Sequence, residues 1–553
     1  MDLIYLDPPF NSNQIYNVIF PGANGLGASA QIQAFTDTWT WDQSAMETLV
    51  DIRREAPARV VTIVDALCES LRESNIAAYI VMMTARLIHL HRVLKDTGSL
   101  YLHCDPTASH YLKVILDVIF GPRNFRNEIV WRRTGSHNNL RRYGPIHDTI
   151  LFYTKSDDYV WNNPTRPYMR SHVEANFVLD ENGYRTNYYG NVLTGSGVRN
   201  GESGRPWRGF DPTAKGRHWA VPGKLIADIP EDFAGLTQHE KLDRLFELGH
   251  IKITPGHAWP IYQRYIRPGD GQLAPDIWAY QPYTEGLVFG TENGIDADVR
   301  WLSPHDQERL KYPTQKPLAL LERIIRASSE PDQVVLDPFC GCGTSIVAAE
   351  SLGRRWIGID ITSLATTVIE NRLDSMFESP DFQVRGLPTT VEEAAALALR
   401  SRFQFQWWAI GRVGAIPTES QEKKGADEGI DGLIRFFDDR SGKPKHCVVS
   451  VKSGKNVEAR DVRDLVGTVE SNKAQAGVLI TLTPPTKPMR QAAARAGMYY
   501  SPLGHDYPKI QIFTVDDLFN ERIPDLPDQE NQRLRRKQRA VQRAHQQQLP
   551  AWD

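Results

Sequence analysis

The sequence has few cysteines and no long apolar segment. Its five cysteines are too few and too scattered among 553 residues for a disulfide framework. Cys340 and Cys342 have no second pair or histidine partner nearby for a zinc site. No apolar run reaches the length of about 18 residues that a membrane-spanning helix needs, and an acid at position 2 argues against a secretory signal. We therefore expect a soluble, cytoplasmic protein with no membrane partner.

The chain also lacks a strong excess of charge of either sign. Its net charge of −3 argues against a wholly basic binder, although a local basic patch is enough for contact with nucleic acid. Residues 122–143 carry six arginines against a single glutamate, and the tail at 526–553 is basic and rich in glutamine. Each patch is either a candidate nucleic-acid contact or, more simply, a solvated face or a frayed terminus.

A length of 553 residues allows about three or four domains, at roughly 150 residues per domain. Residues 1–161 alternate strand-like runs with helical patterns, which favours a mostly parallel α/β sheet with helices on both faces. Residues 162–310 are dense in Gly, Pro, Asn, Tyr and Trp and lack clear periodicity, so we expect a separate irregular module. The strand-and-helix pattern returns at 311–385, and a second α/β unit spans 400–525.

The most specific short motif is Asp7-Pro8-Pro9-Phe10, directly after the strand-like run LIYL. Ligands of α/β sheets bind at the carboxyl ends of strands. The exocyclic amine of a nucleobase is a poor nucleophile, because its lone pair is delocalised into the ring. A carboxylate and a rigidly aimed carbonyl would favour a tetrahedral nitrogen by accepting its N–H groups, and an aromatic neighbour can stack on an extruded base. The alternative is a strand that simply ends in an Asp-Pro-Pro turn.

A second motif has the pattern of a cofactor site. A strand ends at Asp337, the turn FCGCG at 339–343 leads into a helix, and the next strand ends at Asp360. Gly341 and Gly343 let a ligand approach the backbone at a helix N-terminus, and an acid after the next strand can hold ribose hydroxyls. The rival is a nicotinamide dinucleotide, but the third glycine of that fingerprint is absent, so the pattern favours S-adenosylmethionine. The two cysteines are then small residues that line the turn.

These motifs, in this order, resemble the beta class of DNA amino-methyltransferases, in which a target-recognition region separates the D-P-P-aromatic motif from an F-x-G-x-G motif. The F-x-G-x-G motif begins here at Phe339, and YPTQKP at 312–317 resembles a third family element. The resemblance covers residues 1–375 and implies a Rossmann-like S-adenosylmethionine-dependent methyltransferase sheet in permuted order. It implies that Thr314 and Lys316 hold the methionine carboxylate of the cofactor. The other implied cofactor contacts are Asp337, Phe339, Gly341, Gly343 and Asp360.

The resemblance also implies a reaction. The base amine attacks the cofactor methyl group directly, without the cysteine nucleophile of carbon-5 cytosine methylation, and no Pro-Cys dipeptide occurs here. The D-P-P form favours adenine N6 over cytosine N4. The segments 103–105 and 127–131 should lie beside the active-site cleft and the flipped base.

The same resemblance implies that residues 162–310 recognise duplex DNA. Arginine can hydrogen-bond guanine and asparagine can hydrogen-bond adenine, although most such side chains contact phosphates or solvent. The candidate arginines are Arg166, Arg170, Arg185, Arg199, Arg205, Arg208 and Arg217.

One feature departs from the family pattern. Family members carry a short strand-helix segment before the D-P-P strand, whereas that strand begins here at residue 2. A misplaced start codon is favoured over a sheet that lacks this edge element.

Residues 424–453 resemble the restriction-endonuclease-like domain of the Mrr type, in which an Asp, and a Glu or Gln two residues before a Lys, bind Mg²⁺. Asp431 and Lys452 match this pattern, with Asp431 as the candidate metal ligand. Ser450 stands two residues before the lysine and is a weak metal ligand compared with Glu, which counts against cleavage of DNA. The alternatives are a nuclease and a catalytically silent domain that binds DNA or packs on the methyltransferase.

The sequence therefore predicts a site-specific DNA methyltransferase fused to a restriction-endonuclease-like domain. One alternative keeps the methyltransferase and makes residues 400–525 a silent DNA-binding module. Another is a non-catalytic DNA-binding protein, and an RNA substrate also stays open. The oligomeric state is open, a dimer included.

Overall fold

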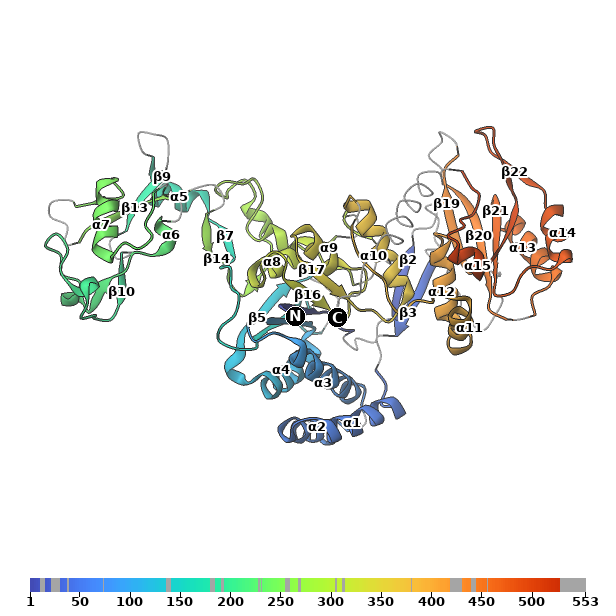
Figure 1. Ribbon diagram of the computed structural model, residues 1–553, viewed down its shortest axis with the longest axis horizontal. Coiled ribbons are helices and arrows are strands. Elements are labelled where there is room, and N and C mark those ends of the chain that lie inside the picture. Colours follow the sequence, from blue (N-terminus) through green and yellow to red (C-terminus); the bar gives the residue numbers. More distant parts are fainter. Residues whose placement is uncertain are drawn as a thin grey trace. The chain divides into compact units, whose positions relative to one another are not determined.

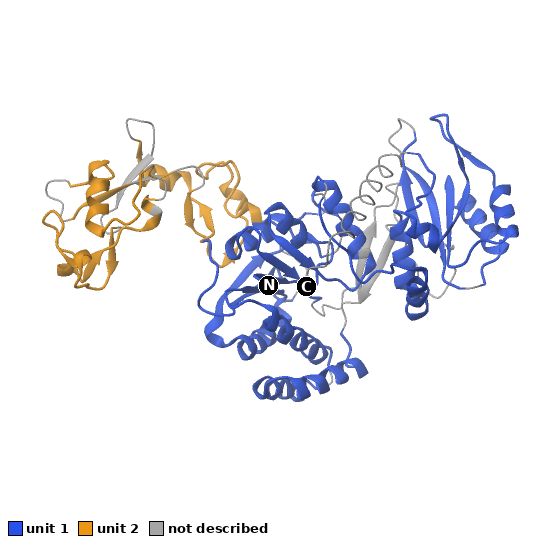
Figure 2. Ribbon diagram, in the orientation of Figure 1, with its two compact units in different colours: residues 1–162, 299–553 blue, residues 163–298 orange. Residues whose placement is uncertain are grey.

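The protein is described by a computed structural model that divides into two compact units, residues 1–162 with 299–553 and residues 163–298 (Figure 2). None of the helices in the part of the chain described below has the length and apolar composition needed to cross a bilayer. The described residues are 1–9, 15–20, 30–36, 39–72, 74–135, 141–179, 185–189, 193–226, 229, 231–253, 259–266, 270–303, 306–310, 314–378, 380–417, 430–438, 444–454 and 456–527.

A mixed sheet forms the centre of the first unit (Figure 1). Within this unit its strands lie in the order β5 (Phe125–Arg132), β6 (His147–Thr154), β4 (Ser99–Cys104), β1 (Leu3–Leu6), β16 (Val334–Asp337) and β17 (Arg355–Gly358). β4, β1, β16 and β17 run parallel, whereas β6 is antiparallel to both β4 and β5. All residues of β1 and β4 are buried, which explains the continuous apolar run of β1. The predicted α/β sheet in permuted order is confirmed, with the first strand of the chain at its centre.

Helices cover both faces of this sheet. α3 (Asn75–Val93) and α4 (Pro106–Phe120) share a buried core with β1 and β4, and Figure 1 shows α8 and α9 on the other side of the sheet. α3 begins after the capping side chain of Ser74, and α4 begins after that of Asp105. The remaining helices here are α1 (Gln43–Glu55), α2 (Ala58–Leu71), α8 (Leu318–Ser328), α9 (Thr344–Ser351) and α10 (Ser363–Met376). An antiparallel pair, β2 (Ile15–Phe20) and β3 (Ala30–Thr36), lies between β1 and α1 in sequence.

The second unit contains short strands around an aromatic core. Its largest sheet has the order β12 (Ile251–Lys252), β13 (Ile261–Ile266), β9 (Arg185–Tyr189) and β8 (Val178–Leu179). Buried Trp207, Trp219 and Trp259 pack with α7 (Gln238–Glu247), which explains the density of tryptophan in this region. The other elements are β7 (Thr165–Pro167), α5 (Arg170–Asn176), β10 (Thr194–Ser196), β11 (Arg217–Trp219), α6 (Gly223–Ile226), β14 (Gly271–Leu273) and β15 (Ile277–Trp278).

The C-terminal part of the first unit contains a second sheet. Its order is β18 (Ile416–Pro417), β19 (Gly432–Phe436), β20 (Lys445–Lys452), β21 (Ala476–Thr481) and β24 (Ile510–Thr514), with β20, β21 and β24 parallel. This confirms the predicted second α/β region. The helices here are α11 (Val391–Arg400), α12 (Arg402–Arg412), α13 (Ala459–Ser471), α14 (Lys487–Arg495) and α15 (Val515–Phe519), and β22 (Met498–Tyr500) pairs with β23 (Asp506–Pro508).

Candidate active site

A cavity of about 580 Å³ opens at the carboxyl ends of β1 and β16. The parallel register pairs Leu3 with Val335 and Ile4 with Leu336, so the residues that follow both strands emerge at the same edge of the sheet. The cavity lining therefore combines the two sequence motifs. It includes Asp7, Pro8, Pro9, Thr314, Lys316, Asp337, Phe339, Gly341 and Asp360. Phe10 lies outside the described residues.

Asp7 contacts a residue that is distant in sequence. The ammonium group of Lys316 forms an ion pair with Asp7 Oδ2, and the exposed fractions of the two side chains are only 10% for Lys316 and 16% for Asp7. Lys316 Nζ also lies 3.4 Å from the carbonyl oxygen of Thr314. The segment that contains Lys316 precedes α8, whose first backbone N–H, at Leu318, donates to Glu308 Oε1 at 2.7 Å. The structure thus brings two predicted site residues into direct contact, a pairing that the motifs did not predict.

The proline pair of the first motif forms one wall of the cavity. Trp39 also lines it, and its indole N–H donates to the carbonyl oxygen of Pro9 at 3.4 Å. Arg86 of α3 lines the same cavity, and its guanidinium donates to the carbonyl oxygen of Met82 at 3.0 Å. Burial lowers the pKa of Arg86. Neither Trp39 nor Arg86 belongs to a motif, so no sequence signal marked either residue.

The glycine turn of the second motif holds a backbone that a larger residue would disturb. Gly341 and Gly343 have φ values of +48° and +75°, and Gly343 is the N-cap of α9. A Cβ atom at Gly343 would lie 2.5 Å from Ile369 Cγ1, so both the conformation and the space require glycine. Cys340 and Cys342 line the cavity, and burial raises the pKa of both thiols, which agrees with inert small residues.

The two acids of this motif lie on either side of the turn. Asp337 accepts hydrogen bonds from the Phe339 N–H at 3.0 Å and from the Ser345 hydroxyl. Burial raises the pKa of Asp337 to about 7, and the like charges of Asp7 and Asp360 act in the same direction. Asp360 accepts the Gly341 N–H at 3.0 Å, and burial raises its pKa as well. Asp360 therefore links the end of β17 to the glycine turn.

A buried polar chain lies behind the cavity wall. Tyr5, which lines the cavity, has its hydroxyl 3.0 Å from His103 Nδ1, and His103 Nε2 lies 3.2 Å from Asp148 Oδ2. The guanidinium of Arg133 is 2.9 Å from Asp148 Oδ1. Burial alone would raise the pKa of Asp148, but His103 and the nearby cations hold it below its ordinary value. Tyr5 stands two residues before Asp7, and side chains at this spacing point to the same face of a strand. This spacing is the sequence signal that could have identified Tyr5 as a residue of the site.

The segments 103–105 and 127–131 support the site from behind. Cys104 is fully buried, and Asp105 caps α4 by accepting the backbone N–H groups of Thr107 and Ala108. Trp131 is buried, packs edge-to-face on His103 with ring centroids 5.5 Å apart, and donates to the carbonyl oxygen of Val299. None of these residues belongs to the described lining of the cavity.

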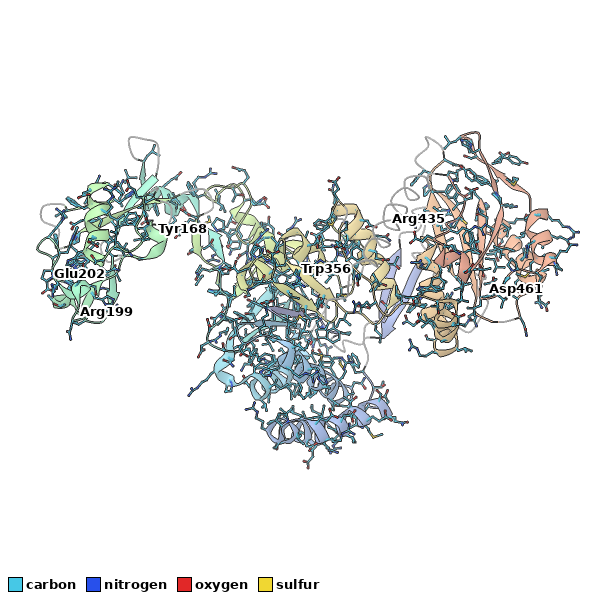
Figure 3. All side chains as sticks on the ribbon, in the orientation of Figure 1. Tyr168, Arg199, Glu202, Trp356, Arg435 and Asp461 are labelled. Carbon is cyan, nitrogen blue, oxygen red and sulfur yellow. The ribbon has the colours of Figure 1, made fainter. Side chains whose placement is uncertain are left out.

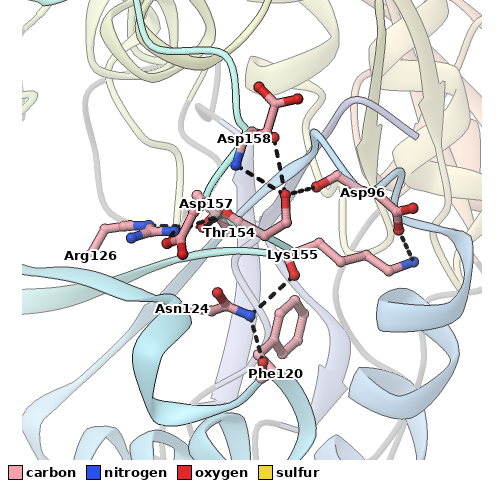
Figure 4. A network of polar contacts seen from close by, with 9 residues as sticks. Asp96, Phe120, Asn124, Arg126, Thr154, Lys155, Asp157 and Asp158 are labelled. Carbon is pink, nitrogen blue, oxygen red and sulfur yellow. Dashed lines mark hydrogen bonds and ion pairs between the residues drawn. The ribbon is translucent and has the colours of Figure 1, made fainter.

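Several arginines of the basic segment 122–143 have partners inside the protein. Arg126 donates to Thr154 Oγ1 at 2.8 Å and to Asp157 at 2.9 Å, in a network that includes Asn124 and Lys155 (Figure 4). Arg132 stacks on Trp301 and Arg133 pairs with Asp148. These three arginines therefore have partners within the protein, and their role in contact with nucleic acid stays a prediction.

The arginines predicted to contact DNA differ in their surroundings. Arg208 lies 4.2 Å over the Phe246 ring and pairs with Asp243, and Arg217 donates to Thr194 Oγ1. Arg166 lies 3.8 Å from Asp296, and Arg170 lies 3.7 Å from Glu292. Arg199 and Arg205 are exposed (Figure 3 labels Arg199). The side chain of Arg185 is outside the described residues.

The nuclease-like motif of the C-terminal part forms a closed cluster. Asp431 directly precedes β19 and accepts hydrogen bonds from the Gln406 amide of α12, from the Val451 N–H at 2.6 Å and from the Ser450 hydroxyl at 3.3 Å. Lys452 lies 3.8 Å from Asp461 of α13 (Figure 3 labels Asp461). Burial raises the pKa of Asp431. Within the described ranges no three acidic, histidine or cysteine side chains are grouped to hold a metal, so these residues do not fit the Mg²⁺ that the motif implied.

Comparison with known families gives two matches along the chain. Residues 1–371 match the family model described as DNA methylase of the N6/N4 class. Residues 415–520 match the model described as NACHT-associated inactive restriction endonuclease 1. The predicted restriction-endonuclease-like resemblance of the C-terminal region is thereby confirmed.

The chain is similar to several curated proteins. It is 31% identical over 308 residues to the type II methyltransferase M.EcaI of Enterobacter cloacae, with 54% of this chain and 57% of that protein covered. It is 24% identical over 368 residues to the type III StyLTI Mod subunit of Salmonella typhimurium, with 64% and 47% covered. It is 49% identical over 110 residues to M2.DpnII of Streptococcus pneumoniae, with 20% and 34% covered. The chain thus spans about half the length of the first two relatives and a third of the last.

Solved structures with some likeness to the chain include two complexes with S-adenosylmethionine. The protein TTHA0409 from Thermus thermophilus gives a TM-score of 0.28 at 14% identity, with 57% of this chain and 86% of that chain covered. M1.HpyAVI gives a TM-score of 0.24 at 16% identity, with 52% and 80% covered.

Proposed function

The chain belongs to the N6/N4 class of DNA methylases, and from this premise we propose that it transfers a methyl group from S-adenosylmethionine to the exocyclic amine of a flipped base in duplex DNA. Adenine N6 is favoured over cytosine N4 because the motif has the D-P-P form. The observation that carries the proposal is the shared cavity, which Asp7 and Pro8 line together with the glycine turn. Its volume of about 580 Å³ is that of a small-molecule site.

The chain's own residues have two tasks in this reaction. Asp7 accepts a hydrogen bond from one N–H of the base amine, and a backbone carbonyl of the proline pair accepts the other. These contacts concentrate the nitrogen lone pair toward the carbon it attacks, and Asp7 is the nearest base for the proton that the nitrogen loses. Bound S-adenosylmethionine supplies an electrophilic methyl group, so no covalent enzyme intermediate is required.

The cofactor is proposed to lie along the second motif. Asp360 is the partner for the ribose hydroxyls, and Asp337 and Phe339 border the same space. Gly341 lines the cavity and lets the backbone approach the ligand without a Cβ atom, whereas Gly343, which is outside the lining, keeps the turn in the conformation that this approach requires. Thr314 and Lys316 are the proposed partners of its carboxylate. The donor and acceptor types in the lining fit a nucleoside that carries an amino-acid arm.

Residues 163–298 are proposed as the target-recognition region, slightly shorter than the range 162–310 expected from composition. The exposed Arg199 and Arg205 are its leading candidates for contact with DNA. Substitution of either would weaken binding to DNA without changing the affinity for the cofactor.

For the C-terminal domain we favour a catalytically silent module over a nuclease. Gln406, Ser450 and the Val451 backbone all donate to Asp431, so its oxygens already have partners where a cation would have to bind. Incubation of plasmid DNA with Mg²⁺ tests this, and cleavage that is lost in Asp431→Ala would support the nuclease instead.

Mass spectrometry of nucleosides tests the main proposal. DNA is incubated with the protein and S-adenosylmethionine, and Asp7→Ala is the control. We expect N6-methyladenine with the unaltered protein alone. N4-methylcytosine would keep the mechanism and change the base. No methylated nucleoside, together with intact DNA binding and no cofactor binding by calorimetry, would favour the non-catalytic DNA-binding alternative.

A further inference from the structure

The ion pair between Lys316 and Asp7 presents a conflict for the proposed reaction. Lys316 donates to Asp7 Oδ2, the carboxylate that must accept a hydrogen bond from the base amine. Both side chains line the cavity and are largely buried there. An ammonium group is a stronger donor than an uncharged aromatic amine, so the base cannot displace Lys316 by hydrogen bonding alone.

Lys316 can leave Asp7 only if another anion forms an ion pair with its ammonium group. A charge that is taken out of an ion pair in a largely buried site is strongly unfavourable unless a new partner receives it. Asp337 and Asp360 already accept hydrogen bonds from the turn residues that surround them, and Asp148, which also feels the charge of Lys316, already pairs with His103 and Arg133. The carboxylate of an amino-acid arm is the remaining anion that the proposed cofactor would bring into this cavity. Lys316 lies 3.4 Å from the backbone oxygen of Thr314, so it has a second anchoring group when it leaves Asp7.

We propose that Lys316 is a shared counter-ion that couples the two substrates of the reaction. Without cofactor, Lys316 neutralises Asp7 and occupies one of its two carboxylate oxygens, Oδ2, which weakens Asp7 as an acceptor. When the cofactor binds, its carboxylate takes Lys316, and Asp7 is released for the base amine. Capture of the base therefore follows binding of the cofactor, and this order rests on the proposed function.

The coupling can be measured without knowledge of the DNA sequence. The probes are S-adenosylhomocysteine, which has the carboxylate but no sulfonium charge, and 5′-methylthioadenosine, which lacks the amino-acid arm. Calorimetry compares the full-length protein with Asp7→Asn, Lys316→Met and the double variant. Lys113→Met is the matched control, because Lys113 forms an ion pair with Asp117 at 2.7 Å and is not in the cavity lining. Melting curves establish that each variant is folded, and Lys316→Gln replaces Lys316→Met if that variant is not.

The expected pattern is specific to a shared lysine. Asp7→Asn should tighten binding of S-adenosylhomocysteine about tenfold, because Lys316 no longer has to leave a partner. Lys316→Met should weaken it, and Asp7→Asn should then have no further effect in the Lys316→Met background. Binding of 5′-methylthioadenosine should stay the same in all variants, as should binding of both probes to Lys113→Met.

Two results would overturn the proposal while leaving the methyltransferase intact. One is tight binding of S-adenosylhomocysteine to the unaltered protein with unchanged or weaker binding to Asp7→Asn. The other is that Asp7→Asn increases the affinity for S-adenosylhomocysteine equally in the unaltered protein and in the Lys316→Met background. If neither nucleoside binds the unaltered protein, the proposed function itself fails, and the coupling fails with it.

Discussion

Two acids, Asp7 and Asp431, each lie next to a strand, Asp7 after β1 and Asp431 before β19, but their surroundings differ. Asp7 lines a cavity of about 580 Å³, and its partner is the side chain of Lys316. Asp431 accepts three hydrogen bonds, one of them from the Val451 backbone, which cannot move away from the strand. The comparison teaches that an acid stays available for chemistry when its partner is displaceable and space adjoins it. It becomes structural when fixed donors saturate its oxygens.

We expect substitution of Asp7 to reduce methyl transfer more than any other change described below. Asp7→Asn keeps the size of the side chain but removes its charge and one acceptor oxygen. We expect methyl transfer to fall by about 10³-fold, because a buried charge near the reacting nitrogen contributes a large electrostatic term. Initial rates of methyl incorporation into DNA measure this. A rate within tenfold of the unaltered protein would remove Asp7 from the mechanism.

The glycine turn that borders the cavity should show the next largest effect. Gly343→Ala places a Cβ atom 2.5 Å from Ile369 Cγ1 at φ +75°, so strain and a clash combine. Gly353→Ala is the matched control, because Gly353 has φ +67° and nothing lies within 4 Å of the position that its Cβ atom would occupy. We expect a loss of unfolding free energy of about 1 kcal/mol for Gly353→Ala and of about 2–4 kcal/mol for Gly343→Ala. Equal losses in urea denaturation would show that Ile369 accommodates the methyl group.

The raised pKa of the buried Asp337 predicts that the stability of the protein depends on pH. The pKa of Asp337 is about 7 in the folded protein and near 4 when unfolded. Between these values the folded state holds the extra proton, so stability falls as pH rises, by up to about 1.4 kcal/mol per pH unit. Asp337→Asn should remove this decline.

Unfolding free energies measured from pH 4 to 7 for the unaltered protein and for Asp337→Asn show how much of the decline in stability with pH comes from Asp337. Asp464→Asn is the control, because Asp464 is an exposed acid on α13 with 67% of its side chain accessible. Parallel pH curves for the unaltered protein and Asp337→Asn would contradict the raised pKa.

The smallest expected effect concerns Asp431. Addition of Mg²⁺ should move the melting temperature of the unaltered protein by less than about 1 °C, because a ligand that does not bind cannot stabilise. Asp431→Asn should leave the rate of methyl transfer unchanged. A clear Mg²⁺-dependent shift that disappears in Asp431→Asn would show that the cluster opens to a cation.

Two substitutions should convert the Asp431 cluster into a site that binds a cation. Gln406→Glu together with Ser450→Glu replaces two of the donors around Asp431 with carboxylates, which repel it and recruit a divalent cation. We expect Mn²⁺ to bind this double variant measurably by calorimetry and not to bind the unaltered protein. Failure of the folded double variant to bind Mn²⁺ would show that more than these two side chains closes the site.

Local sequence alone predicted much of the fold and part of the site. The apolar run LIYL predicted the strand that became β1, and the strand-turn-helix pattern around Gly343 located the glycine turn. These features depend on residues close together in the chain. Composition does not reveal that Arg126 and Arg133 of the basic segment 122–143 have acidic partners on or after β6.

Local sequence placed Asp7 after β1 and Asp431 before β19, and therefore gave the chain two candidate reactive acids. The partners of those acids depend on contacts between distant segments. Lys316 reaches Asp7 across 309 residues because β1 and β16 pair in parallel, and Gln406 reaches Asp431 because α12 lies beside the start of β19. A side chain's charge is a local property, but its free energy depends on the donors around it, and those donors come from distant parts of the chain.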